Sequence, residues 1–165
     1  MSGLPDRPEV RRVEVTDPIA TARPCDYADA FEVRLPEPDQ CPPEMWVRAG
    51  LEATPGWVKR VVGLLGLRRA PQSSADRLAG FQVVESSPEV VHLERSVSLL
   101  RVVMVGRRVE PTRRTLTTVL YFKRPMLARL VWALVGLGHR RIAPHVITAK
   151  VSTSDRIGDD SERAS

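Results

Sequence analysis

The chain has 165 residues, of which 42% are hydrophobic and 27% are charged. Both fractions are close to those of an average globular domain, and they exclude a wholly disordered chain, a collagen or a coiled coil. The longest nearly apolar stretch, residues 126–138, contains Arg129 and is shorter than the roughly 20 residues needed to cross a bilayer, so we expect no transmembrane helix.

The net charge of +5 is concentrated in the second half of the chain. Residues 111–154 contain no carboxylate and eight Lys or Arg side chains. A basic surface of this kind attracts anionic lipids, nucleic acid or an acidic partner. A solvated basic face without any partner explains the same composition.

We expect both ends of the chain to be poorly ordered. Residues 1–26 are rich in proline and lack apolar periodicity, which predicts a flexible leader, and residues 152–165 predict a disordered tail. The N-terminal residues lack the apolar core of a secretory signal, so Cys25 and Cys41 are expected to stay reduced. This reasoning favours a cytoplasmic protein without a metal or another cofactor.

The first half of the expected domain contains one strand and two short helices. Apolar and polar residues alternate over residues 29–35, which predicts a half-buried strand. Pro42 and Pro43 suit the first turn of a helix over residues 44–52, because their missing N–H groups would be unpaired there anyway. A second helix is expected over residues 54–69.

The second half contains further strands and then a long helix. Alternating β-branched residues predict four strands with short links, which makes them antiparallel; they begin at Phe81, Val91, Val97 and Thr115. Residues 126–141 are apolar nearly all round, which is typical of a helix on the buried face of a sheet. Pro144 is expected to kink or restart this helix.

This order of elements predicts an α+β fold. A curved antiparallel β-sheet would wrap around the long C-terminal α-helix, with two short helices after the first strand. The sheet needs a cover for its buried face, and residues 126–141 are the only element long and apolar enough to supply it. We expect a hollow between the sheet and this helix.

Three segments carry a resemblance to a known family. They are AGFQVVESSPEVVHLE at residues 79–94, TLTTVLYFKRP at residues 115–125 and LVWALVGLGHRRIAP at residues 130–144. These segments are similar to a family of actinobacterial domains in the START-like superfamily, which includes polyketide cyclases and lipid-transfer domains. The resemblance covers about residues 27–151. It implies a helix-grip fold around an apolar pocket, and it brings no catalytic residues.

The three histidines are candidates for acid–base or metal chemistry, because the pKa of an imidazole lies near neutrality. His139 and His145 would point about 240° apart on one helix, so they cannot bind a metal together. His92 alternates with apolar neighbours and is expected to face away from the core. A structural or surface role explains each histidine as well as a chemical one.

Cavity residues are expected among one carboxylate and several aromatic side chains. Alternation puts Glu85 on the same side of its strand as Phe81 and Val83, and a general acid would have to be buried there. Trp132 lies on the helix expected to cover the hollow, where its indole N–H would orient a polar ligand group. Ordinary core filling also explains the aromatic residues. The full set of expected cavity residues is Trp46, Trp57, Phe81, Glu85, Phe122 and Trp132.

These expectations favour binding of a hydrophobic small molecule, such as a lipid or a polyketide-like metabolite, between the sheet and the C-terminal helix. One alternative is a cyclase, dehydratase or isomerase that uses a pocket carboxylate or histidine on the same scaffold. Another is a basic protein that docks on an anionic membrane surface through residues 126–141. We expect no binding to nucleic acid, because the helix at residues 54–69 has few amide or hydroxyl groups to read bases.

Overall fold

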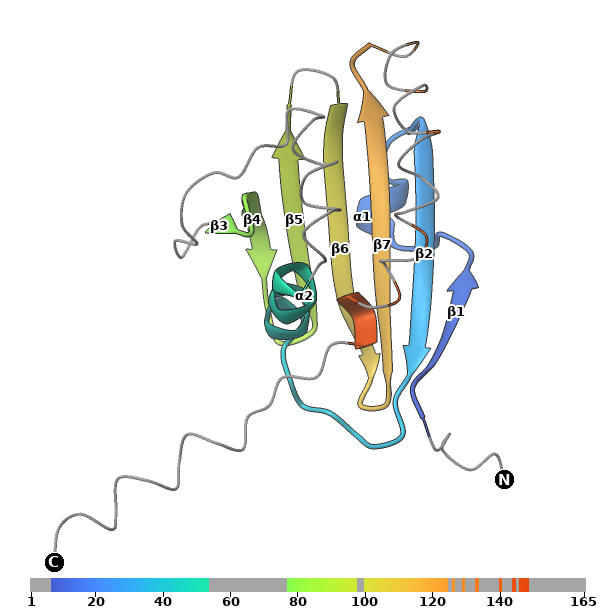
Figure 1. Ribbon diagram of the computed structural model, residues 1–165, viewed down its shortest axis with the longest axis vertical. Helices are drawn as coiled ribbons and strands as arrows, with labels where there is room; N and C mark the ends of the chain where they lie inside the picture. Colours follow the sequence, from blue (N-terminus) through green and yellow to red (C-terminus); the bar gives the residue numbers. More distant parts are fainter. Residues whose placement is uncertain are drawn as a thin grey trace, which may run out of the picture.

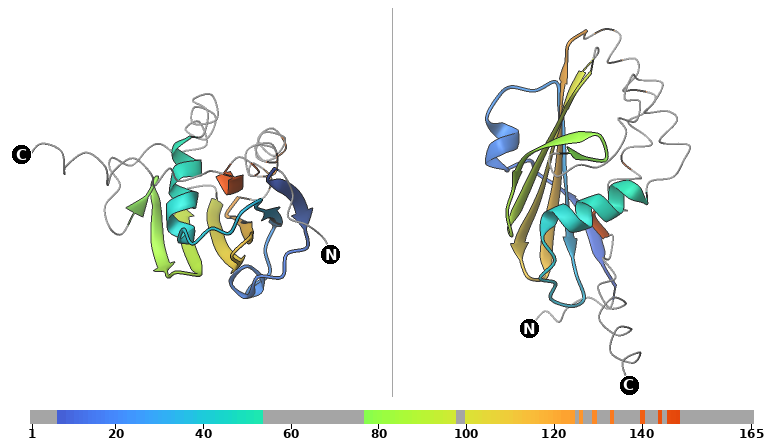
Figure 2. Two further views of the ribbon diagram at one scale, coloured as in Figure 1. Left: turned by 90° about the horizontal axis from the view of Figure 1, so that it is seen from below. Right: turned by 90° about the vertical axis from the view of Figure 1, so that its left-hand side faces the viewer.

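A computed structural model describes residues 7–53, 77–97, 100–124, 126, 129, 133, 140, 144 and 146–148. Within these residues, the main element is a seven-stranded antiparallel sheet with the order β1-β2-β7-β6-β5-β4-β3 (Figure 1). Helices α1 (Pro18–Thr21) and α2 (Pro43–Glu52) lie on opposite faces of this sheet (Figure 2). The strands are β1 (Glu9–Val13), β2 (Tyr27–Arg34), β3 (Arg77–Leu78), β4 (Phe81–Ser86), β5 (Val90–Ser96), β6 (Leu100–Glu110) and β7 (Arg113–Phe122).

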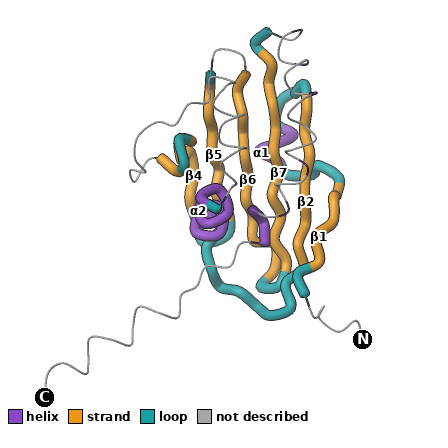
Figure 3. Tube along the Cα trace, viewed as in Figure 1, coloured by secondary structure: helices purple, strands orange, loops and turns teal. Residues whose placement is uncertain are grey.

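Strands β3 to β7 follow one another as an antiparallel meander, because each link between them is short (Figure 3). The turn between β4 and β5 is closed by Ser87, whose backbone N–H donates to the Val90 carbonyl at 2.8 Å. The Ser87 hydroxyl also accepts a hydrogen bond from the Val90 N–H at 3.1 Å. The strands predicted to begin at Phe81, Val91 and Thr115 are confirmed as β4, β5 and β7.

The face covered by α2 holds the larger core. Trp46 and Val47 of α2 are fully buried there. Gly106 of β6 permits the close approach of the helix, because a Cβ at this position would lie only 2.8 Å from Val47 Cγ2. The other buried members of this core are Phe31, Val33, Leu35, Leu78, Val91, Leu93, Met104, Leu116, Val146 and Ile147.

The opposite face is covered by α1, which begins at an Asp17 cap. The Asp17 carboxylate accepts a hydrogen bond from the Ile19 N–H at 2.9 Å, and Pro18 occupies the first helical position. Ala20 is 2% exposed and belongs to a second apolar core on this face. The other buried members of this core are Val90, Val103, Val105 and Val119.

The segment expected to be a flexible leader, residues 1–26, includes two regular elements: residues 9–13 form β1 and residues 18–21 form α1. Strand β1 adds to the edge of the sheet beside β2, with Val10 opposite Val33. Arg11 of β1 forms a 2.7 Å ion pair with Glu32 of β2, whose side chain is 8% exposed. Cross-strand pairing and the capped helix therefore order a segment that has no apolar periodicity. The expected tail at residues 152–165 lies outside the described residues.

The expected helix-grip fold is wrong. The described residues contain a seven-stranded sheet with short helices on both faces, and no long C-terminal helix is found among them. Four residues of the helix expected at 126–141 are described, and all four are exposed: Met126, Arg129, Ala133 and Arg140. The expectation failed because it assumed one buried face, whereas buried valines line both faces of the central strands.

The helix expected over residues 44–52 is confirmed as α2, with Pro42 as its N-cap and Pro43 at its first helical position. Its Gly50 packs so closely on residues 146–148 that a Cβ would lie 2.5 Å from Val146 Cα. The second helix, expected over residues 54–69, lies outside the described residues. Within the part of the chain that the structure describes, no helix has the length and apolar character needed to cross a membrane.

Candidate functional site

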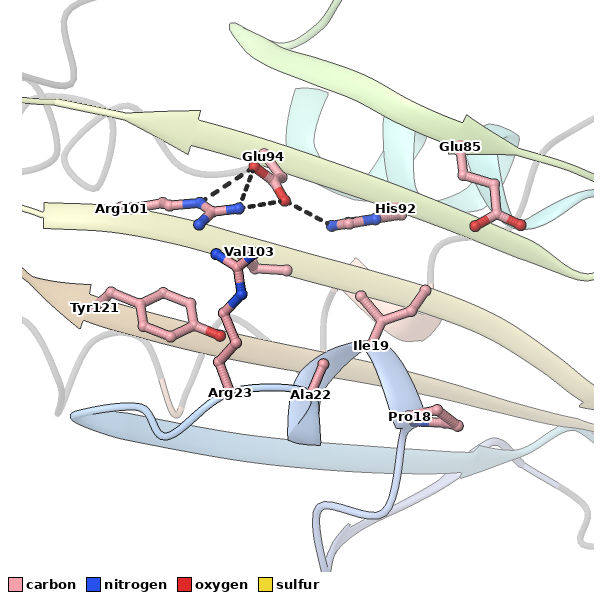
Figure 4. Close-up of a pocket in the computed structure, with 10 residues that line it drawn as sticks. All are labelled: Pro18, Ile19, Ala22, Arg23, Glu85, His92, Glu94, Arg101, Val103 and Tyr121. Atoms are coloured by element: carbon pink, nitrogen blue, oxygen red, sulfur yellow. Dashed lines mark hydrogen bonds and ion pairs between the residues drawn. The ribbon is translucent and has the colours of Figure 1, made fainter.

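A groove of about 380 Å³ lies between α1 and the sheet, on the face opposite α2 (Figure 4). One wall comes from α1 and the two residues that follow it, Ala22 and Arg23. The floor comes from side chains of β5, β6 and β7. Four lining residues give this groove apolar surface: Pro18, Ile19, Ala22 and Val103. The others add charged and polar groups: Arg23, Glu85, His92, Glu94, Arg101 and Tyr121.

Glu85 reaches the groove because of a bulge in β4. Val83 pairs with Leu93 of β5, but the next pair is Glu85 with His92, so Val84 is the additional residue. Strict alternation would put Glu85 on the side of Val83, and the bulge turns it to the side of His92. The prediction that Glu85 shares the side of Phe81 and Val83 is therefore wrong. Glu85 is exposed at one end of the groove.

Glu94 and Arg101 form a rigid ion pair in the groove floor. Arg101 Nη2 lies 2.7 Å from both carboxylate oxygens of Glu94, and Arg101 Nε donates to Oε2 at 3.1 Å. The guanidinium carbon lies 5.6 Å from the centre of the Tyr121 ring, which Arg101 faces across the β6–β7 pair. Several hydrogen bonds and the aromatic contact hold the two planar groups in one orientation.

His92 lies beside this ion pair. Its Nε2 atom is 3.1 Å from Glu94 Oε1, and the His92 side chain is 12% exposed. The Nε2 atom is buried, and it has no aligned hydrogen-bond partner among the described residues. His92 faces away from the α2 core, because Val91 and Leu93 on either side of it belong to that core. It lies on the second covered face of the sheet, however, so the single core assumed from the sequence does not describe its surroundings.

Some charged side chains of the groove have an ion-pair partner, and others do not. Arg23 and Glu85 have no ion-pair partner within the described part of the chain, whereas Glu94 and Arg101 are paired with each other. Figure 4 shows Arg23 extending from the end of α1 across the sheet towards Val103, on the side of Arg101 and Tyr121. Glu85 lies at the other end. The groove therefore has a cationic end and an anionic end.

Most of the expected cavity residues lie elsewhere. Trp46 is 0% exposed in the α2 core, where its Nε1 atom has no hydrogen-bond partner among the described residues and Arg114 lies 5.2 Å over its ring. Phe81 and Phe122 are half-buried together beside Leu100, Val102 and Leu120. Trp57 and Trp132 lie outside the described residues. Glu85 alone of the six expected residues lines the described groove, and a cavity between the sheet and a C-terminal segment stays a prediction.

His139 and His145 also lie outside the described residues. In the ranges that the structure describes, no group of three or more His, Cys, Asp or Glu side chains is placed to hold a metal ion. Cys25 and Cys41 are both free thiols.

Sequence reasoning missed the groove because it treated the face of His92 as solvated. The sequence pattern alone did not link Arg23 or Arg101 to any site. A usable signal was present in β6, where residues 102–105 read VVMV without alternation. A strand that is apolar on both sides is typically covered on both faces of its sheet.

Comparisons of the chain with protein-family models, with curated proteins and with solved structures found no match. The resemblance to the START-like superfamily therefore stays a prediction, and the helix-grip fold that it implied is the part that the structure contradicts.

Proposed function

We propose that the protein binds a small molecule in the groove between α1 and the sheet. The observation that carries this proposal is the combination, within about 380 Å³, of an apolar strip and polar groups that retain bonding capacity. Sites for small molecules combine apolar walls with a few polar groups that orient the ligand. Ile19 and Val103 would supply the apolar contact, and Arg23 and Tyr121 would supply the orientation.

The Glu94–Arg101 pair supports this proposal because it fixes the floor before a ligand arrives. A site whose groups are already held loses less conformational entropy when it binds. The pair also lies beside the imidazole, since Glu94 Oε1 is 3.1 Å from His92 Nε2. A ligand would therefore meet groups that need little rearrangement.

A binding experiment tests the proposal directly. Two-dimensional amide NMR of the full chain would be followed during titration with a library of neutral and charged aromatic fragments. We expect saturable shifts at Ile19, His92 and Val103. The A22W variant should abolish them, because an indole at this exposed wall position fills the groove without altering a core. The proposal fails if no fragment shifts these residues, or if A22W leaves the shifts unchanged.

A second candidate, acid–base catalysis in the same groove, is favoured by the His92–Glu94 contact of 3.1 Å. An imidazole beside a carboxylate is an arrangement that general-base catalysis uses. Turnover of a bound ligand that is lost in H92Q, while its binding is kept, would support catalysis. Turnover retained in H92Q would contradict it.

Two earlier expectations stay predictions beside this proposal. They are docking of the basic second half on an anionic membrane surface and a cytoplasmic location. Vesicle flotation at low and high salt tests the first, because an electrostatic association weakens as salt screens the charges.

A further inference from the structure

We infer that the groove selects an amphipathic organic acid with a single anionic group, which is held at the Arg23 end. This inference rests on the proposed function, since it names the class of ligand for the same groove. It follows from the distribution of charge along the groove and from the donors that the protein itself leaves unused.

The cationic end has three hydrogen-bond donors without partners among the described residues. Arg23 makes no hydrogen bond or ion pair there, and Arg101 engages Glu94 through Nε and Nη2 only, which leaves Nη1 free. The Tyr121 hydroxyl is also without a hydrogen-bond partner in the described ranges, and it lies on the same side of the groove. Two guanidinium groups and a phenol form a suitable donor set for a carboxylate or sulfonate.

The compensation of charge favours an anion at this end. Glu94 balances Arg101, so the charge of Arg23 is the one left uncompensated. An anionic ligand would supply the missing charge, whereas a cationic ligand would add a second positive group beside Arg23. The two ends of the groove therefore differ in which ligand groups they attract.

The rest of the groove limits the ligand further. The apolar strip of Ile19 and Val103 lies between the two charged ends, so the ligand body next to the acid should be apolar. Glu85 at the far end would repel a second anionic group. A monoanion with an apolar body fits both conditions, and a dianion of the same length does not.

The test uses two fluorescent probes of almost the same shape. One is 8-anilinonaphthalene-1-sulfonate, a monoanion, and the other is N-phenyl-1-naphthylamine, which lacks the sulfonate. Both are titrated into the full chain, into R23Q, into R12Q and into A22W. Arg12 is a matched control because it is exposed on β1 and has no ion-pair partner among the described residues. It pairs with Phe31, which belongs to the α2 core, so Arg12 lies on the face of the sheet opposite the groove.

We expect R23Q to weaken binding of the sulfonate probe about fivefold, as expected for one charge-assisted contact from an exposed side chain, and to change the neutral probe less than about twofold. R12Q should leave both affinities unchanged, and A22W should abolish both. If A22W abolishes binding but R23Q leaves the sulfonate affinity within about twofold of the wild type, the inference is overturned and small-molecule binding stands. If A22W changes neither probe, the groove is not the binding site, and the proposed function falls together with the inference.

Discussion

Asp17 and Arg107 join α1 to the sheet. One carboxylate oxygen of Asp17 accepts a hydrogen bond from Arg107 Nε of β6 at 2.8 Å, while the other caps the helix through the Ile19 N–H. The Asp17 side chain is 7% exposed. A single residue therefore both begins the helix and holds it over the groove.

The D17A variant should be less stable than the wild type by about 2 kcal/mol, because it loses the helix cap and the contact to Arg107 together. D17N should lose about half as much, since asparagine caps a helix nearly as well but carries no charge. Urea unfolding measures both free energies. E14A is the control, because Glu14 is exposed and has no ion-pair partner in the described part of the chain. Equal stabilities of D17A and E14A would contradict the assignment.

We expect replacement of Gly50 by alanine to destabilise the protein. On helix propensity alone, G50A in α2 would stabilise the protein by about 1 kcal/mol. The added Cβ, however, would lie 2.5 Å from Val146 Cα and 2.6 Å from the Val146 carbonyl oxygen, so a backbone segment would have to move. We therefore expect a destabilisation of about 2 kcal/mol, as typical for overpacking.

Thermal unfolding of G50A, with A49G as the control, tests whether G50A lowers or raises the stability of the protein. A49G should show the ordinary cost of glycine in a helix, about 1 kcal/mol. A G50A protein that is more stable than the wild type would show that residues 146–148 do not pack on α2 as described.

We expect replacement of Arg114 by lysine to destabilise the protein. Its side chain is 3% exposed, forms an ion pair with Asp39 and lies 5.2 Å over the Trp46 ring. Burial lowers the pKa of Arg114 to about 10, so the group is still charged at neutral pH. R114K keeps the charge but loses the planar group that stacks on the indole, and we expect a loss of about 1–2 kcal/mol in the free energy of unfolding. R12K is the exposed control, and equal losses in both variants would refute the role of stacking.

The hydrogen bonds that Glu44 accepts should make part of the free energy of unfolding dependent on pH. The Ser86 hydroxyl donates to Glu44 Oε2 at 2.6 Å, and this hydrogen bond, with that from Arg48, lowers the pKa of Glu44 below its ordinary 4.5. A lowered carboxyl pKa contributes stability that is present above the ordinary value and is lost as the pH falls through the folded-state value. E44Q should therefore cost about 1 kcal/mol near neutral pH.

The difference between the wild type and E44Q should shrink as the pH falls below the ordinary value of 4.5, and it should be smallest below the lowered pKa of Glu44. Urea unfolding across the acidic range measures it. S86A should remove a large part of the pH-dependent difference, because the Ser86 hydrogen bond is the largest cause of the lowered pKa. A difference that is constant with pH would contradict this account.

The sequence predicted the regular strands well and the groove poorly, and the reason lies in particular residues. Strands β4, β5 and β7 have β-branched residues and turn residues between them, so they could be found from local pattern. Strand β1 could not, because EVRRV has only two apolar residues and its stability comes from Glu32 and β2 across the sheet. The position of Glu85 depends on a bulge whose register is set by pairing with β5, which alternation cannot foresee.

The strand order also imposes a sequence of events during synthesis. Strand β2 pairs with β1 and with β7, the last strand in the described part of the chain, so β2 completes its pairing only after β7 has been made. A two-stranded hairpin is marginally stable by itself. The edge of β2 that pairs with β7 therefore stays without its partner strand until β7 has been made. Contacts so distant along the chain also favour slow folding, which makes this edge a natural point of engagement for a chaperone.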